Sequence, residues 1–197
     1  LYLDREEFEK SAEYLKKALL ANKAFPPALV TMGNLLFETG NAEQAIKYHQ
    51  QALKHNEKEL QALIGLGNAY YDTGAPDTAI KFYKRALEQD SHLSDVHYKL
   101  GNALYLVEKV DDAISHYQLA IKLNPKKPES FYNLGNALCV KADYDNAIAA
   151  YQTAIDLDPK NAPAFYNLGN ALYMQNRFED AIKSYVRALE INSKSPE

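Results

Sequence analysis

Apolar residues along this chain recur three and four positions apart, which is the spacing of helices that bury one face. In the 34-residue segment counted from Pro128, one such stretch fills positions 3 to 14 and a second fills positions 17 to 30. The prolines fall between these stretches or in a first helical turn, where a missing N–H is harmless. The pattern therefore predicts helical hairpins joined by connections of only a few residues.

The same pattern repeats every 34 residues without an insertion. The octapeptide FYNLGNAL occurs at residues 131–138 and again at residues 165–172. Stepping by 34 residues aligns five glycines, which are Gly33, Gly67, Gly101, Gly135 and Gly169. The next column holds five asparagines, which are Asn34, Asn68, Asn102, Asn136 and Asn170. A fixed period of this length indicates a repeat protein in which each hairpin stacks on its neighbours.

The period divides the chain into units. Complete units are predicted at residues 26–59, 60–93, 94–127, 128–161 and 162–195, after a partial unit at residues 1–25 that holds a second helix only, while residues 196–197 begin a further unit or a tail. We therefore expect an all-α solenoid forming one domain, with eleven helices, the first over residues 8–21, and no strand. The sequence lacks an initial methionine and begins within a hairpin, which suggests a fragment of a longer chain.

The repeated glycine needs a structural reason, because glycine weakens a helix by about 1 kcal/mol relative to alanine. We expect the glycine at position 8 of each unit to face the alanine at position 20, so that the two helices of a hairpin approach closely. Position 24 is predicted to belong to the core. It holds His49, Tyr83, Tyr117, Tyr151 and Tyr185.

The amino-acid composition argues against several classes of function. The 197 residues are 47% hydrophobic and carry a formal net charge of -4, so the chain should fold and lacks the basic surface that binds nucleic acid. No run of 18 apolar residues and no signal pattern occurs, so we expect no membrane insertion. The single cysteine, Cys139, permits no internal disulfide and fits a cytoplasmic location.

The repeated columns resemble the tetratricopeptide repeat family, whose pattern has a large residue, then Leu-Gly, an aromatic, alanine, an aromatic and alanine. The best copy matches this pattern at Phe165, Leu168, Gly169, Leu172, Ala181, Tyr185 and Ala188. Departures are local, because other residues hold the family's tryptophan position and its closing proline occurs only as Pro125 and Pro159. The resemblance implies a right-handed superhelix whose first helices line a concave groove for peptides or protein surfaces.

Positions 2, 5, 6, 9, 12 and 13 of each unit share the helix face opposite the packing face, so we expect them to line this groove. Position 13 holds Glu38 and Asp72 in the first two units and apolar residues later. A partly apolar peptide is therefore expected at the later units, with any basic residues toward Glu38 and Asp72. The predicted groove residues are Tyr98, Lys99, Asn102, Leu106, Tyr132, Asn133, Asn136, Val140, Tyr166, Asn167, Asn170 and Met174.

The asparagine column has two interpretations. An asparagine amide both donates and accepts hydrogen bonds, so a row of them can hold a peptide backbone regardless of its sequence. Alternatively, each asparagine bonds a neighbouring helix and fixes the stacking angle. Asn133 and Asn167, at position 6, are the better ligand candidates because the other units carry Thr31, Gly65 and Lys99 there.

Two specialised subfamilies provide a comparison. Co-chaperones that hold acidic tails use a lysine at position 5, but position 5 is never basic here, and Lys99 is the only cation predicted to point into the groove. Arrays of O-linked N-acetylglucosamine transferases carry an asparagine ladder at position 6, which only Asn133 and Asn167 match. Neither subfamily pattern is complete in this chain.

The sequence carries no catalytic or metal-binding signature. Its five histidines have no HExxH or other ligand spacing, and it has no glycine-rich phosphate loop or GxSxG elbow. We therefore predict a protein interaction module, not an enzyme, with no cofactor and no metal, that binds a protein or peptide in its groove. The alternatives are a targeting array of a larger enzyme, such as an O-linked N-acetylglucosamine transferase, and a scaffold that self-associates end to end.

Overall fold

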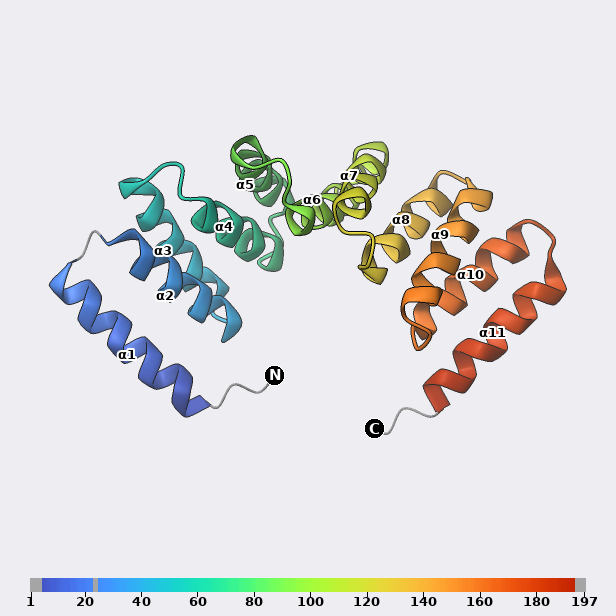
Figure 1. Ribbon diagram of the computed structural model, residues 1–197, viewed down its shortest axis with the longest axis horizontal. Helices are drawn as coiled ribbons and strands as arrows, with labels where there is room; N and C mark the ends of the chain where they lie inside the picture. The colour runs from blue at the N-terminus through green and yellow to red at the C-terminus, as the bar shows by residue number, and fades with distance from the viewer. Residues whose placement is uncertain (1–4, 23–24, 194–197) are drawn as a thin grey trace. The chain divides into compact units, whose positions relative to one another are not determined.

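The computed structural model describes residues 5–22 and 25–193, which form eleven α-helices and no strand (Figure 1). This result confirms the predicted all-α repeat fold and the predicted number of helices. The chain divides into two compact units, unit 1 at Leu1–Ser91 and unit 2 at His92–Glu197. The repeat boundaries inside these units stay a prediction.

Unit 1 contains a lone leading helix followed by two hairpins. Its helices are α1 (Arg5–Ala21), α2 (Pro26–Glu38), α3 (Ala42–His55), α4 (Leu60–Asp72) and α5 (Pro76–Gln89). The leading helix α1 packs on α2, α2 pairs with α3, and α4 packs on α3 and pairs with α5. Helix α1 therefore begins three residues before the expected start at residue 8.

Unit 2 contains three hairpins built in the same way. Its helices are α6 (Ser94–Leu106), α7 (Val110–Leu123), α8 (Pro128–Val140), α9 (Tyr144–Leu157), α10 (Ala162–Met174) and α11 (Phe178–Ser193). The first helix of each later hairpin packs on the second helix of the hairpin before it, α8 on α7 and α10 on α9. None of the helices in the described part of the chain is long and apolar enough to cross a membrane.

Two residues after the end of the first helix of each hairpin, the backbone enters the left-handed region. Gly40 and Gly74 adopt φ values of 79° and 75°, as expected for glycines that close a helix. Glu108, Ala142 and Asn176 adopt φ values of 61°, 56° and 61° in the hairpins of unit 2. The same turn is therefore made with and without glycine.

The nearest neighbour of each repeated glycine is an aromatic ring at position 24. A Cβ atom built on Gly135 would lie 2.6 Å from Cε1 of Tyr151, and one built on Gly67 would lie 2.3 Å from Cε1 of Tyr83. The close approach is therefore real, and the facing of the alanine at position 20 stays a prediction. The ring at position 24 belongs to the core as predicted, because Tyr83 and Tyr151 are 2% and 1% exposed.

His49 replaces the tyrosine in the hairpin of α2 and α3. Its ring is fully buried, and a Cβ atom added to Gly33 or to Gly65 would lie within 2.6 Å or 2.3 Å of it. Among the described residues, no group forms a hydrogen bond with either ring nitrogen. Burial therefore lowers the pKa of His49 from 6.5 to about 4, because the apolar surroundings disfavour the charged ring.

Substituting Gly135 by alanine should destabilise the protein, because the new methyl group would displace the buried Tyr151 ring. We expect the free energy of unfolding to fall by about 1 to 3 kcal/mol, the scale of an overpacked core, although alanine is the better helix former. Urea unfolding followed by circular dichroism measures the change. The exposed position Gln152 provides the control, since Gln152→Ala should stay within about 0.5 kcal/mol. A Gly135→Ala variant as stable as the parent protein would show that the ring does not need the glycine.

Acid should destabilise the protein through His49. Between pH 6.5 and about pH 4 the unfolded chain binds a proton on this ring that the folded chain does not bind, so stability falls as the pH falls through this window. The loss is at most roughly 3 kcal/mol, from about 1.4 kcal/mol for each pKa unit. Urea midpoints measured across this pH range should depend less on pH in the His49→Phe variant. The matched control is His55→Phe at an exposed site near the end of α3, which should keep the parent slope. An unchanged slope in His49→Phe would contradict the assignment.

Candidate peptide-binding surface

All twelve residues predicted to line the groove lie in unit 2, on the first helices of its three hairpins. We call this surface the asparagine face. It consists of Tyr98, Lys99, Asn102 and Leu106 on α6, Tyr132, Asn133, Asn136 and Val140 on α8, and Tyr166, Asn167, Asn170 and Met174 on α10. The predicted carboxylates Glu38 and Asp72 are exposed at the ends of α2 and α4, in unit 1.

A tyrosine hydroxyl fixes each position-9 asparagine of unit 2. The hydroxyls of Tyr117, Tyr151 and Tyr185 donate to the Oδ1 atoms of Asn102, Asn136 and Asn170, at 2.9, 2.8 and 2.9 Å. The same bond joins Tyr83 to Asn68 in unit 1, at 3.0 Å. Burial raises the pKa of Tyr83, Tyr151 and Tyr185, so these hydroxyls stay protonated and donate.

Asn133 and Asn167 connect neighbouring hairpins. Nδ2 of Asn133 donates to Oδ1 of Asn102 at 2.9 Å and to the hydroxyl of Tyr98 at 3.2 Å. Nδ2 of Asn167 donates in the same way to Asn136 at 2.9 Å and to Tyr132 at 3.1 Å. These two asparagines, which we expected to be ligand residues, therefore also hold α8 against α6 and α10 against α8.

The network fixes the orientation of the amides. The Oδ1 atoms of Asn102 and Asn136 each accept two of these hydrogen bonds. The Nδ2 group of each of these two asparagines donates no bond in this network. The Nδ2 groups of Asn133 and Asn167 each donate two hydrogen bonds. The Oδ1 atom of each of these two asparagines accepts no bond in this network. Donors and acceptors therefore alternate along the asparagine face.

Aromatic rings surround this network. The rings of Tyr132 and Tyr151 lie 6.1 Å apart, and those of Tyr166 and Tyr185 lie 5.6 Å apart. Such tilted pairs add to the apolar burial of each hairpin. Tyr132 is only partly exposed, whereas Tyr166 is 55% exposed. The tyrosines Tyr132 and Tyr166 thus pack on the ring of their own hairpin and also contribute to the surface.

The apolar residues predicted for this surface are exposed. Leu106, Val140 and Met174 have 56%, 58% and 56% of their surface accessible. A separate pocket of about 480 Å³ lies at the start of α10, and Tyr132, Tyr166 and Asn167 line it together with residues of α11. Three of the predicted residues therefore meet at one concave site.

Lys99 and Cys139 are partly buried, and burial shifts the pKa of each side chain. Burial lowers the pKa of the Lys99 amine, and the side chain is only partly exposed. Burial raises the pKa of the Cys139 thiol, which accepts a 3.5 Å hydrogen bond from the Tyr151 hydroxyl. A thiol of this kind is a weak nucleophile at neutral pH. In the described part of the chain, no group of three or more His, Cys, Asp or Glu side chains is placed to hold a metal ion.

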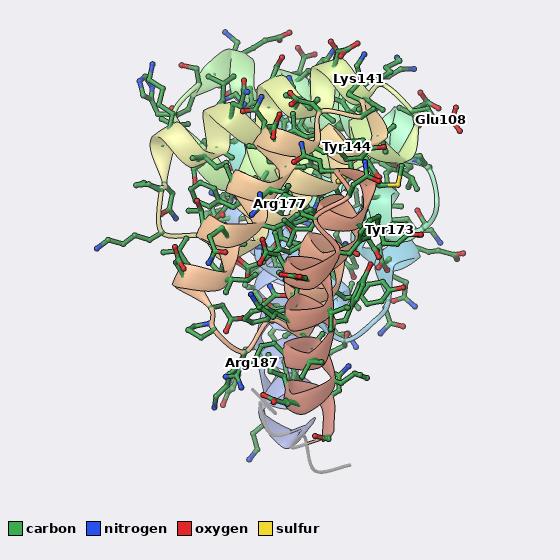
Figure 2. The ribbon with its side chains drawn as sticks, turned by 90° about the vertical axis from the view of Figure 1, so that its right-hand side faces the viewer. Glu108, Lys141, Tyr144, Tyr173, Arg177 and Arg187 are labelled. Atoms are coloured by element: carbon green, nitrogen blue, oxygen red, sulfur yellow. The ribbon has the colours of Figure 1, made fainter. Side chains whose placement is uncertain are left out.

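Sequence reasoning missed the role of the core tyrosines in fixing the asparagines. The signal was available, because in four of the five units a tyrosine follows the asparagine by 15 residues. Figure 2 shows the side chains of this part of the chain, including Tyr173 at the end of α10. Tyr173, predicted for position 12 of the groove, is 56% exposed and packs its ring edge on Phe178, at 5.3 Å.

Comparison with known proteins identifies related sequences and structures. The sequence profile of the tetratricopeptide repeat matches residues 30–93, 98–162 and 132–196. No match is found among curated proteins. The chain is similar to the solved structure of YrrB, described as a TPR protein with an unusual peptide-binding site, at 27% identity and a TM-score of 0.82, covering 93% of this chain and 94% of YrrB.

A second group of similar structures is MamA. One crystal structure of MamA is 29% identical with a TM-score of 0.79, covering 83% of this chain and 95% of that chain. MamA from Desulfovibrio magneticus RS-1 is 19% identical with a TM-score of 0.82, covering 87% of this chain and 97% of that one. At that identity the likeness concerns the fold alone.

Proposed function

Because this chain belongs to the tetratricopeptide repeat family, whose members act as protein interaction modules, we propose that it binds an extended, partly apolar peptide on the asparagine face of unit 2. The observation that carries this proposal is the alternation of Nδ2 donors and Oδ1 acceptors along that face. An extended backbone presents its own carbonyl acceptors and N–H donors in alternation. The peptide-binding site described for YrrB adds support by similarity.

Each part of the face has a defined role in this proposal. The Nδ2 groups of Asn102, Asn136 and Asn170 donate to peptide carbonyl groups. The Oδ1 atoms of Asn133 and Asn167 accept from peptide N–H groups. The exposed side chains of Leu106, Val140 and Met174 contact apolar side chains of the peptide, while the tyrosine rings border the site. Basic partner residues near Glu38 and Asp72, and a parent enzyme such as an O-linked N-acetylglucosamine transferase, stay predictions from the sequence.

The test exploits the fixed orientation of Asn136. Asn136→Asp keeps an oxygen to accept from Tyr151 and Asn167 but replaces the outward donor by an acceptor. A suitable probe is a 12-residue peptide selected from a displayed random library against the intact chain. We expect its affinity to fall by about 1 to 3 kcal/mol, or roughly 5- to 150-fold, with little change in the melting temperature.

The matched control is Tyr151→Phe. This variant removes the hydroxyl that fixes Asn136 but leaves the surface atoms unchanged, so it should lower the melting temperature more than it lowers the affinity. Recovery of no binding peptide, or Asn136→Asp binding as tightly as the parent chain, would contradict the proposal and leave the asparagines with a structural role.

Self-association is a second candidate function, favoured by the apolar row on α11. Phe178, Ile182, Val186 and Leu189 are 48%, 60%, 48% and 68% exposed. In the preceding hairpin Ile155, the counterpart of Leu189, is only 6% exposed and packs in a cluster with residues of α10. Helix α1 of a second copy offers complementary apolar surface, because its Leu20 is 76% exposed. Contacts of this head-to-tail kind extend instead of closing.

This second candidate predicts a mass that rises with concentration. Light scattering from micromolar to millimolar protein should show species heavier than the 22.2 kDa monomer. Replacing both Ile182 and Leu189 by lysine should restore the monomer, because charged side chains oppose burial of the row. Replacing the exposed Lys160 and Lys183 by alanine is the control and should leave association unchanged. A strict monomer at every concentration would overturn the idea.

A further inference from the structure

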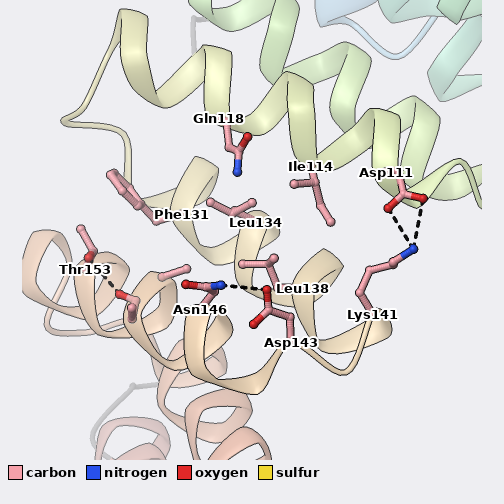
Figure 3. Close-up of a pocket in the computed structure, with 12 residues that line it drawn as sticks. Asp111, Ile114, Gln118, Phe131, Leu134, Leu138, Lys141, Asp143, Asn146 and Thr153 are labelled. Carbon is pink, nitrogen blue, oxygen red and sulfur yellow. Dashed lines mark hydrogen bonds and ion pairs between the residues drawn. The ribbon is translucent and has the colours of Figure 1, made fainter.

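A second concave surface lies between α7, α8 and α9 (Figure 3). We call it the outer hollow. It has a volume of about 580 Å³, within the range of roughly 300 to 1,000 Å³ that is typical of ligand pockets. Its floor is apolar, formed by Ile114 of α7, Phe131, Leu134 and Leu138 of α8, and Ala150 of α9.

The outer hollow is separate from the asparagine face. At 100° per residue, Phe131, Leu134 and Leu138 lie on the side of α8 opposite to Asn133 and Asn136. No residue that lines the hollow belongs to the asparagine face. Binding at one surface therefore does not require the other, and either assignment can fail alone.

A small residue, Ala150, forms part of the floor of the hollow. The corresponding positions of the five hairpins hold Tyr48, Phe82, His116, Ala150 and Ser184. In unit 1 the ring of Phe82 stacks on Tyr70, with centroids 5.6 Å apart. In the first hairpin of unit 2 the ring of His116 stacks on His97, at 5.2 Å. Ala150 provides no ring, so the equivalent space on α8 and α9 is open.

The rim of the hollow is polar and carries more negative than positive charge. Lys141 reaches across to Asp111 of α7, with Nζ 2.9 Å from Oδ1 (Figure 3). The second rim carboxylate, Asp143, accepts a 2.8 Å hydrogen bond from Asn146. The lining residues thus include two carboxylates and one ammonium group.

We propose that the outer hollow is a second docking site, which takes one aromatic or aliphatic side chain of a partner protein segment that carries a lysine or arginine beside it. The open apolar floor receives the anchor side chain, which is the usual way in which a partner inserts into a pocket. The cation lies at Asp143, since the charge of Lys141 is already paired with Asp111. Charge complementarity of this kind selects a basic segment over an acidic one.

The probe is the blocked tetrapeptide acetyl-Gly-Phe-Arg-Gly-amide, titrated into the intact chain and followed by methyl NMR of Ile114, Leu134 and Leu138. We expect saturable shifts of these methyl groups. Replacing the arginine of the peptide by glutamate, or its phenylalanine by alanine, should weaken binding at least fivefold. Absence of shifts, or equal binding of the three peptides, would overturn the proposal.

Two variants of the protein locate the site. Ala150→Phe supplies the ring that Phe82 provides in unit 1 and should weaken binding of the probe at least tenfold. Gln152→Phe adds the same ring to the same helix at an exposed position that does not line the hollow, and should bind like the parent chain. Asp143→Asn keeps an oxygen for Asn146 and should weaken the Phe-Arg probe at least threefold while barely affecting the Phe-Glu probe. Ala150→Phe or Asp143→Asn binding as tightly as the parent would contradict the assignment.

Discussion

The contact between an aromatic ring on the second helix and a glycine on the first determines most of this structure. The ring lies so close that a Cβ atom at Gly67 or Gly135 would come within 2.3 or 2.6 Å of it. A tyrosine placed there buries its hydroxyl, and a buried hydroxyl without a partner costs about 1 to 3 kcal/mol. The asparagine after the glycine provides the partner. Close packing and hydrogen bonding thus involve one tyrosine, one glycine and one asparagine in each of the four hairpins that carry the tyrosine.

The same contact prepares the surface for binding. Once Tyr151 donates to Oδ1 of Asn136, the orientation of that amide is set, and Asn167 donates to the same oxygen from the next hairpin. The amide nitrogen is left as the part of the side chain that these bonds do not use. A preorganised donor loses less conformational entropy on binding than a rotating one. The residues that stack the hairpins are therefore also the residues that orient the proposed peptide-binding groups.

In the hairpin of α2 and α3, a histidine replaces the tyrosine, and the contact with the glycines changes with it. His49 is shorter than tyrosine, and it touches Gly65 of the next hairpin as well as Gly33 of its own. Gly65 occupies the position that Asn133 and Asn167 occupy in unit 2. A larger residue at position 65 would collide with the imidazole ring. The histidine at position 49 therefore excludes an asparagine at position 65. Gly65 therefore cannot supply the side-chain amide that Asn133 and Asn167 supply between hairpins in unit 2.

The sequence predicted the helices well because a 34-residue period states the same boundaries five times. It also predicted that Leu106, Val140 and Met174 are exposed, since helical periodicity separates a buried from an open side. Periodicity says nothing about which atoms meet across helices. The ring that lies against each glycine was therefore not foreseen, and the asparagines were left with two interpretations, of which the structure shows the hydrogen bonds to neighbouring helices.

The outer hollow was missed for a related reason. Repeated columns reveal the fold, whereas the hollow is lined by Ala150, which belongs to a column that holds a different residue in each of the five units. Position 150 lies beside Tyr151, yet successive residues on a helix point about 100° apart. The ring of Tyr151 can therefore hold the hairpin together while its neighbour opens or closes the outer side. A repeat built in this way separates the residues that maintain the fold from those that vary its binding surfaces, so that one substitution can add a site without disturbing the contact between ring, glycine and asparagine.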